Sequence, residues 1–109
     1  MPFNNHGNRS FTVMSVDNNA PAASGVYGIS NARQWIYVGE TANIQAELAR
    51  HLRSPNIFLK EHAPSGFTFE LSAPEHRGER RNRLVVELDP IGNRPIAGFS
   101  DRPAGGQEA

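Results

Sequence analysis

The fold of this chain is decided by residues 25–39, which read GVYGISNARQWIYVG. Two short apolar runs, 25–29 and 35–38, flank a polar turn, and this arrangement is typical of a β-hairpin. Each expected strand carries one tyrosine, Tyr27 or Tyr37, with a glycine two residues away. The sequence therefore predicts a hairpin in which each strand pairs a tyrosine with a glycine.

Outward from the hairpin, the sequence pattern changes between helical and strand-like periods. Apolar side chains at every fourth position from Ile44 to Leu52 predict a helix that begins at residue 41 or 42. Either Thr41 or Asn43 is its candidate N-cap. The other expected elements are a short helix within 56–62, a strand over 67–71, a helix from Pro74 to about Leu88 and, before the hairpin, an edge strand at 11–16.

The order of these elements, hairpin, helix, short helix, strand and helix, predicts the fold class. It is a small α/β (α+β) domain in which helices flank a three-stranded mixed or antiparallel sheet. A chain of 109 residues has room for one domain. We expect a flexible N-terminus at 1–10, the domain at 11–93 with its core at 24–93, and a flexible Pro- and Gly-rich tail at 94–109.

Composition excludes several classes of protein. Eleven basic residues balance eleven acidic ones, so the chain lacks the basic excess of a non-specific nucleic-acid binder, although a local basic patch is compatible with it. The absence of cysteine excludes disulfides and cysteine-ligated metals. No apolar run approaches the ~20 residues that span a bilayer, and the N-terminus does not resemble a signal peptide. We expect a cytoplasmic protein that does not bind membranes.

The motifs of the hairpin carry a resemblance to a known family. The sequences GVY at 25–27, YVG at 37–39 and TANI at 41–44 resemble the start of the GIY-YIG nuclease domain. Leu84-Val85, Pro90 and Asn93 resemble the closing helix of that family. The resemblance covers residues 24–93, and it implies a domain that cleaves phosphodiesters with one divalent metal ion, Mg²⁺ or Mn²⁺.

The resemblance also implies roles for three residues. Tyr27 and Tyr37 match the two tyrosines that line the family's site, one of which is thought to activate the attacking water. His51 matches a histidine on the first helix that assists many members. The alternative is that all three side chains pack in the core, as most strand tyrosines do.

Two positions of the family pattern are exchanged in this chain. The family's phosphate-binding arginine would stand three residues after Ile44, where the chain has Glu47. The metal-binding glutamate would stand three residues before Leu84, where the chain has Arg81, and a guanidinium cannot ligate a cation. Two hypotheses remain open: Glu47 and Arg81 form an ion pair, or they exchange roles. The metal ligands are accordingly unknown.

Basic residues on the helices offer a local surface for nucleic acid. Arginine suits phosphate recognition, whereas mixed charges on a helix usually mean a solvated face. The candidates are Arg50, Arg53, Arg77 and Arg80.

These observations favour one function and leave an alternative. The favoured function is a catalytically impaired, nuclease-like domain that binds DNA, another nucleic acid, a partner protein or a second copy of itself, without a cofactor. The alternative is an active DNA endonuclease that uses Mg²⁺ or Mn²⁺ with rearranged catalytic residues.

Overall fold

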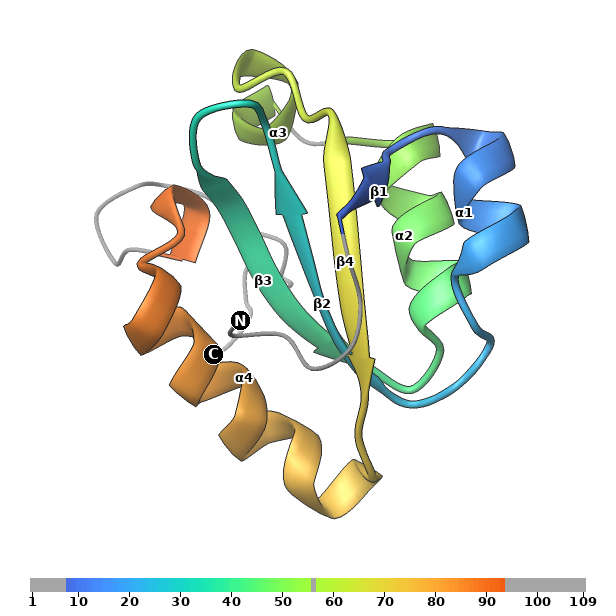
Figure 1. Ribbon diagram of the computed structural model, residues 1–109, viewed down its shortest axis with the longest axis vertical. Coiled ribbons are helices and arrows are strands. Elements are labelled where there is room, and N and C mark those ends of the chain that lie inside the picture. Colours follow the sequence, from blue (N-terminus) through green and yellow to red (C-terminus); the bar gives the residue numbers. More distant parts are fainter. Residues whose placement is uncertain (1–7, 56, 94–109) are drawn as a thin grey trace.

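A four-stranded sheet with helices on both faces forms the centre of the computed structural model, which describes residues 8–55 and 57–93 (Figure 1). Strands β2 (Gly25–Ser30) and β3 (Trp35–Thr41) are the expected hairpin and pair antiparallel. The Asn31 Oδ1 accepts hydrogen bonds from the backbone N–H groups of Arg33 and Gln34, at 2.8 and 2.9 Å, and so closes the turn.

The sheet has four strands, so the prediction of three was wrong. β4 (Gly66–Leu71) pairs antiparallel with β2, and β1 (Arg9–Ser10) pairs antiparallel with β4, which makes the strand order β1-β4-β2-β3. The two residues of β1 lie in the segment that we expected to be a flexible N-terminus. They were missed because a pair of residues has no periodicity. The rest of that segment, residues 1–7, and the expected tail at 94–109 lie outside the described residues.

The edge strand expected at 11–16 is also wrong. Residues Val13–Asn19 form the helix α1, and the Thr12 hydroxyl caps it by accepting a hydrogen bond from the backbone N–H of Ser15 at 3.2 Å. Val16 is buried, whereas Val13 is 63% exposed. The loose alternation of this segment therefore reflects one buried position on a helix rather than the two faces of a strand.

The remaining helices lie close to the predicted positions. They are α2 (Ile44–Arg53), α3 (Ile57–Glu61), α4 (Pro74–Leu88) and the 3₁₀ turn η1 (Ile91–Asn93). Asn43 is the N-cap of α2, since its Oδ1 accepts a hydrogen bond from the Ala46 N–H at 2.9 Å.

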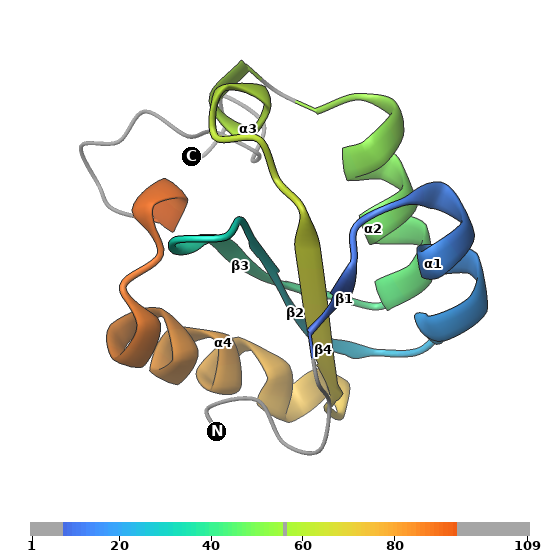
Figure 2. The ribbon, with the colours of Figure 1, turned by 45° about the horizontal axis from the view of Figure 1, so that its top comes forward.

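The helices divide between the two faces of the sheet (Figure 2). α1 and α2 cover one face, where Tyr27 packs with Ile44 and Leu48 of α2. α4 covers the other face, where Leu84 packs against Val26 and Val38. Neighbouring residues of a strand point to opposite faces, so Val26 and Tyr27 belong to different cores. Within the described ranges, no helix combines the length and the apolar content that crossing a membrane requires.

Candidate active site

Three aromatic rings gather on the α2 face of the sheet. Tyr27 and Tyr37 come from the two strands of the hairpin, and His51 comes from the last turn of α2. The ring centroids are 6.2 Å apart for Tyr27 and Tyr37, 5.7 Å for Tyr27 and His51, and 6.0 Å for Tyr37 and His51. The fold thus brings together the three residues that match the family pattern.

The centre of this aromatic cluster is closed to water. Tyr27 is 1% exposed and His51 2%, and the Tyr27 hydroxyl lies 2.9 Å from the His51 Nε2 in a hydrogen bond. Gly39 lies directly across from Tyr27 in the β2–β3 pair, and a Cβ atom on Gly39 would stand 2.6 Å from the Tyr27 hydroxyl oxygen. The glycine of the second motif therefore makes room for the tyrosine of the first.

Glu47 stands at the edge of the aromatic cluster, on the same helix as His51. Its carboxylate pairs with Arg50 one turn later. The Glu47 Oε2 also lies 3.7 Å from the His51 Nε2, beyond the range of a good hydrogen bond. An acidic residue thus stands at the position where the resemblance implies a phosphate-binding arginine, and its carboxylate is paired with Arg50.

Arg81 lies on the other face of the sheet. Its Nε donates to the Asn82 Oδ1 at 2.9 Å, and its Nη2 is 4.0 Å from the Glu40 Oε2. The hypothesis of an ion pair between Glu47 and Arg81 is therefore wrong in this structure: each residue pairs with a different partner, and their helices pack on opposite faces of the sheet.

Two further arginines of α4 also face the sheet. Arg77 donates from Nε to the Glu40 Oε1 and from Nη1 to the Ser24 hydroxyl, both at 3.0 Å. Arg80 holds both carboxylate oxygens of Glu70 at 2.9 Å. The hydrogen bond to Glu70 raises the pKa of the Arg80 guanidinium, against the opposing effect of burial. Both candidate nucleic-acid contacts on α4 are thus paired with acidic side chains of the same chain, although they stay partly exposed.

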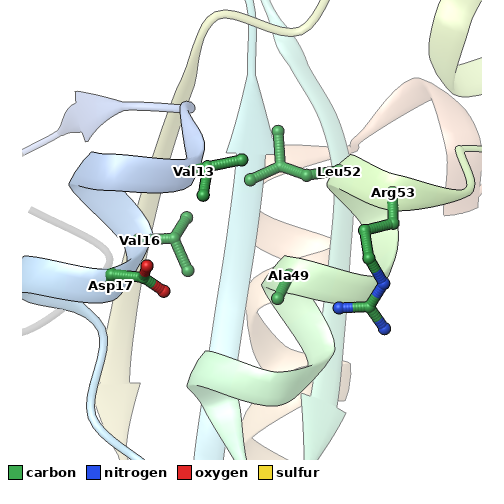
Figure 3. Close-up of a pocket in the computed structure, with 6 residues that line it drawn as sticks. All are labelled: Val13, Val16, Asp17, Ala49, Leu52 and Arg53. Carbon is green, nitrogen blue, oxygen red and sulfur yellow. The ribbon is translucent and has the colours of Figure 1, made fainter.

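The last arginine candidate, Arg53, borders a shallow hollow between α1 and α2 (Figure 3). The hollow has a volume of about 150 Å³. Its lining is mostly apolar, and two charged residues, Asp17 and Arg53, also line it; the apolar residues are Val13, Val16, Ala49 and Leu52. Arg53 is exposed, but none of the aromatic site residues lines this hollow.

The donor set of the site does not fit a divalent metal. Mg²⁺ and Mn²⁺ prefer carboxylate oxygens, whereas the aromatic cluster consists of two tyrosines and a histidine and contains no carboxylate. Across residues 8–55 and 57–93, no group of three or more histidine, cysteine, aspartate or glutamate side chains is placed to hold a metal ion. Glu47 would have to leave Arg50 to serve as a ligand.

Sequence reasoning missed the acidic partners of α4, Glu40 and Glu70. A signal was present, because Arg77, Arg80 and Arg81 repeat at helical spacing on a segment without large apolar residues. The register of three strands was needed to show that both carboxylates lie opposite that segment.

Asn93 was recognised only as part of the family's closing pattern, without a role. In the structure its side chain pairs with the edge strand β3: its Oδ1 accepts from the Val38 N–H at 2.8 Å, and its Nδ2 donates to the Val38 carbonyl at 3.0 Å. Asn93 thus satisfies backbone groups that face away from β2.

No family model matches the sequence, and no curated protein matches it either. The fold, however, is similar to solved structures of the GIY-YIG N-terminal endonuclease domain of UvrC from Thermotoga maritima. The magnesium-bound form superposes with a TM-score of 0.57 at 20% identity, over 69% of this chain and 91% of that chain. A tyrosine-to-phenylalanine mutant bound to its catalytic divalent cation superposes with the same TM-score at 18% identity, over 69% and 91%.

The solved domains include such mutants at three tyrosines, which stand ten and then fourteen residues apart. The same two intervals separate Tyr27, Tyr37 and His51 in this chain. Another of the solved domains replaces an asparagine by alanine. The order of strands and helices, the aromatic cluster and this superposition lead to one conclusion: the chain has the fold of a GIY-YIG endonuclease domain.

Proposed function

We propose that this chain is a nuclease-like domain that binds nucleic acid but no longer hydrolyses it with a divalent metal. The observation that carries the proposal is the exchange of charge at the two positions on which the chemistry depends. Glu47 stands where a phosphate-binding arginine is expected, and Arg81 stands where a metal-binding glutamate is expected.

The surroundings of Glu47 support the loss of hydrolysis. Phosphoryl transfer requires positive charge around the phosphate, and a carboxylate at this place repels it. Arg50 is the nearest guanidinium, and its pairing with Glu47 reduces the positive charge that it offers to a phosphate.

The surroundings of Arg81 support the same conclusion for the metal. The UvrC domains are described with a catalytic divalent cation, magnesium in one case. In this chain a guanidinium occupies the position of the ligand, and the nearby Glu40 is already paired with Arg77 at 3.0 Å. No hydrolytic step through a metal follows from these residues.

The aromatic cluster has a role that does not need catalysis. Tyr27 and His51 are buried and bonded to each other, so they stabilise the junction of the hairpin and α2. Tyr37 is half-buried at the margin of this cluster and can contact a bound nucleotide. A surface of this kind binds nucleic acid weakly on its own. A second copy of the chain or a partner protein that contacts the same nucleic acid would raise the overall affinity.

A nicking assay on supercoiled plasmid tests the proposal, with Mg²⁺ and separately with Mn²⁺. The wild type is expected to leave the plasmid intact while it shifts the anisotropy of a fluorescent DNA duplex. The double variant Glu47→Arg with Arg81→Glu restores both charges of the family pattern, and nicking gained by it would support the assignment of these two positions. Single variants serve as controls, since each restores only half of the pattern.

The second candidate function is an active endonuclease in which Glu47 and Arg81 have exchanged roles. It is favoured by the aromatic cluster, whose intervals match those of the mutated tyrosines in the UvrC domain. Metal-dependent nicking by the wild type that disappears in Tyr27→Phe would establish this function and refute the first proposal.

A further inference from the structure

The first half of α4 is attached to the sheet in an unusual way. Residues 74–83 read PEHRGERRNR and contain no large apolar side chain. Among the fifteen residues of α4, all of them described, only Leu84 is buried. Most helices dock through an apolar stripe, so another force must hold this half of the helix.

The acidic residues opposite α4 form a row across the sheet. Glu40 of β3 and Glu70 of β4 both lie directly across from Val26 of β2, on either side of it. Adjacent strands are about 4.8 Å apart, so the two Cα atoms are about 10 Å apart. Val26 faces α4, and both carboxylates therefore face the same helix.

Each carboxylate is occupied by arginine from that helix. Arg77 and Arg81 reach Glu40, and Arg80 holds Glu70 through two hydrogen bonds. Gly78 permits the close approach, because a Cβ atom there would stand 3.3 Å from the Glu40 Oε2. Three guanidinium groups at helical spacing thus meet a row of two carboxylates.

We infer that Arg77, Arg80 and Arg81 form a binding surface for the phosphate backbone of nucleic acid, which Glu40 and Glu70 close from inside the molecule. Carboxylate and phosphate are the two groups that the planar fork of arginine binds in the same bidentate way. The two acidic side chains thus occupy the guanidinium donors that a phosphate would otherwise take. This inference rests on the proposed function, since it concerns how the domain binds nucleic acid.

The exposure of these ion pairs allows phosphates to compete for them. The side chains of Arg77 and Arg80 are 23% exposed and that of Arg81 is 32% exposed, so solvent anions reach all three. Because these pairs are partly buried, salt screens them less than it screens fully exposed pairs.

Charge-neutral variants of the two carboxylates test the inference. The double variant Glu40→Gln with Glu70→Gln frees the arginines, while Glu75→Gln with Glu79→Gln removes the same charge from exposed positions of the same helix. Affinity for a short DNA duplex is measured by fluorescence anisotropy between about 50 and 200 mM salt, where phosphate contacts change affinity strongly.

The first variant is expected to bind about tenfold or more tightly than the wild type, since each new contact is an ionised hydrogen bond. The slope of log K against log salt is expected to steepen by about two to three, at ~0.9 for each phosphate contacted. The control variant is expected to keep the wild-type slope. Equal gains in both variants would overturn the inference, because they would reflect net charge alone.

A measurement on the wild type covers the case in which the first variant unfolds. The Nε–H groups of Arg77 and Arg80 donate to carboxylates, and their NMR signals are expected to shift together as DNA is added. DNA binding that leaves both signals unchanged would overturn the inference and leave the proposed function intact. If neither the wild type nor the variants bind DNA, the proposed function itself fails.

Discussion

Gly39 and Tyr27 illustrate how a two-residue contact specifies the hairpin. The tyrosine ring lies over Gly39 of the neighbouring strand. It can do so only because residue 39 has no side chain, since a Cβ atom there would overlap the ring. Gly25 is constrained in the same way, since a Cβ atom there would stand 2.3 Å from the Glu70 carbonyl oxygen. Both motif glycines thus follow from packing and need no role in catalysis.

The change Gly39→Ala is expected to destabilise the domain by about 1–3 kcal/mol, the usual cost of overpacking a core. Chemical denaturation monitored by circular dichroism measures this change. Gly78→Ala is the matched control, because its Cβ would meet only the flexible Glu40 carboxylate and alanine favours a helix by about 1 kcal/mol. A Gly39→Ala protein as stable as the wild type would contradict the packing role.

At the scale of elements, α4 and β3 are each held by polar contacts that the apolar pattern does not predict. The first half of α4 is held to the sheet by three arginine–glutamate contacts, and its second half packs through apolar residues from Leu84 onward. β3 is an edge strand whose outer backbone groups at Val38 are satisfied by the Asn93 side chain. An edge strand capped in this way offers fewer free groups for pairing with another chain.

The change Arg80→Met is expected to destabilise the domain by about 1–3 kcal/mol, since it leaves the half-buried Glu70 carboxylate without this partner. The pKa of Arg80 is raised in the folded state by its hydrogen bond to Glu70, so its contribution is fully present below the ordinary arginine pKa and is lost only as pH rises through the raised value.

The stability difference between wild type and Arg80→Met is therefore expected to stay constant between about pH 6 and 9, far below the arginine pKa. Urea denaturation at several pH values checks this, with Arg83→Met, which changes an exposed arginine of the same helix, as the control. A difference that vanishes within this pH range would show that another titrating group governs the contact.

The change Asn93→Ala is expected to cost about 1–3 kcal/mol, because two hydrogen bonds to the backbone of Val38 are lost. Hydrogen exchange of the Val38 amide is the most direct readout, and it is expected to accelerate. Asn93→Asp is the informative comparison, since its carboxylate keeps the acceptor for the Val38 N–H and loses the donor to the carbonyl. An unchanged hydrogen-exchange rate of the Val38 amide in Asn93→Ala would show that the Asn93 side chain does not protect this backbone group.

At the scale of the whole molecule, the carboxylates next to the two candidate positions are paired with arginines, Glu47 with Arg50 and Glu40 with Arg77. A ligand that binds only the folded state raises the melting temperature as its concentration rises. Because the described residues offer no metal-binding group of three side chains, the melting temperature is expected to be the same in EDTA and in excess Mg²⁺. A saturable rise with Mg²⁺ in thermal melts, absent in Glu47→Gln, would instead assign Glu47 to a metal site.

Much of the fold was predictable from local sequence. The hairpin, α2, β4 and α4 follow from apolar periodicity and capping residues, which act between near neighbours, and of the two cap candidates for α2 the structure uses Asn43. The resemblance to the family implied that Tyr27, Tyr37 and His51 belong to one site, and the fold brings their rings together. The helix α1 was mistaken for a strand because a single buried residue, Val16, does not define a period.

Residue identity and spacing alone predict the hairpin, α2, β4 and α4, because periodicity and capping act between near neighbours. Which charges meet depends on the tertiary fold. Ion pairs such as Glu40 with Arg77 and Glu70 with Arg80 join positions 37 and 10 residues apart. They depend on strand register and on the face that each helix covers, because charges attract at any sequence separation but pair only where the fold brings them together.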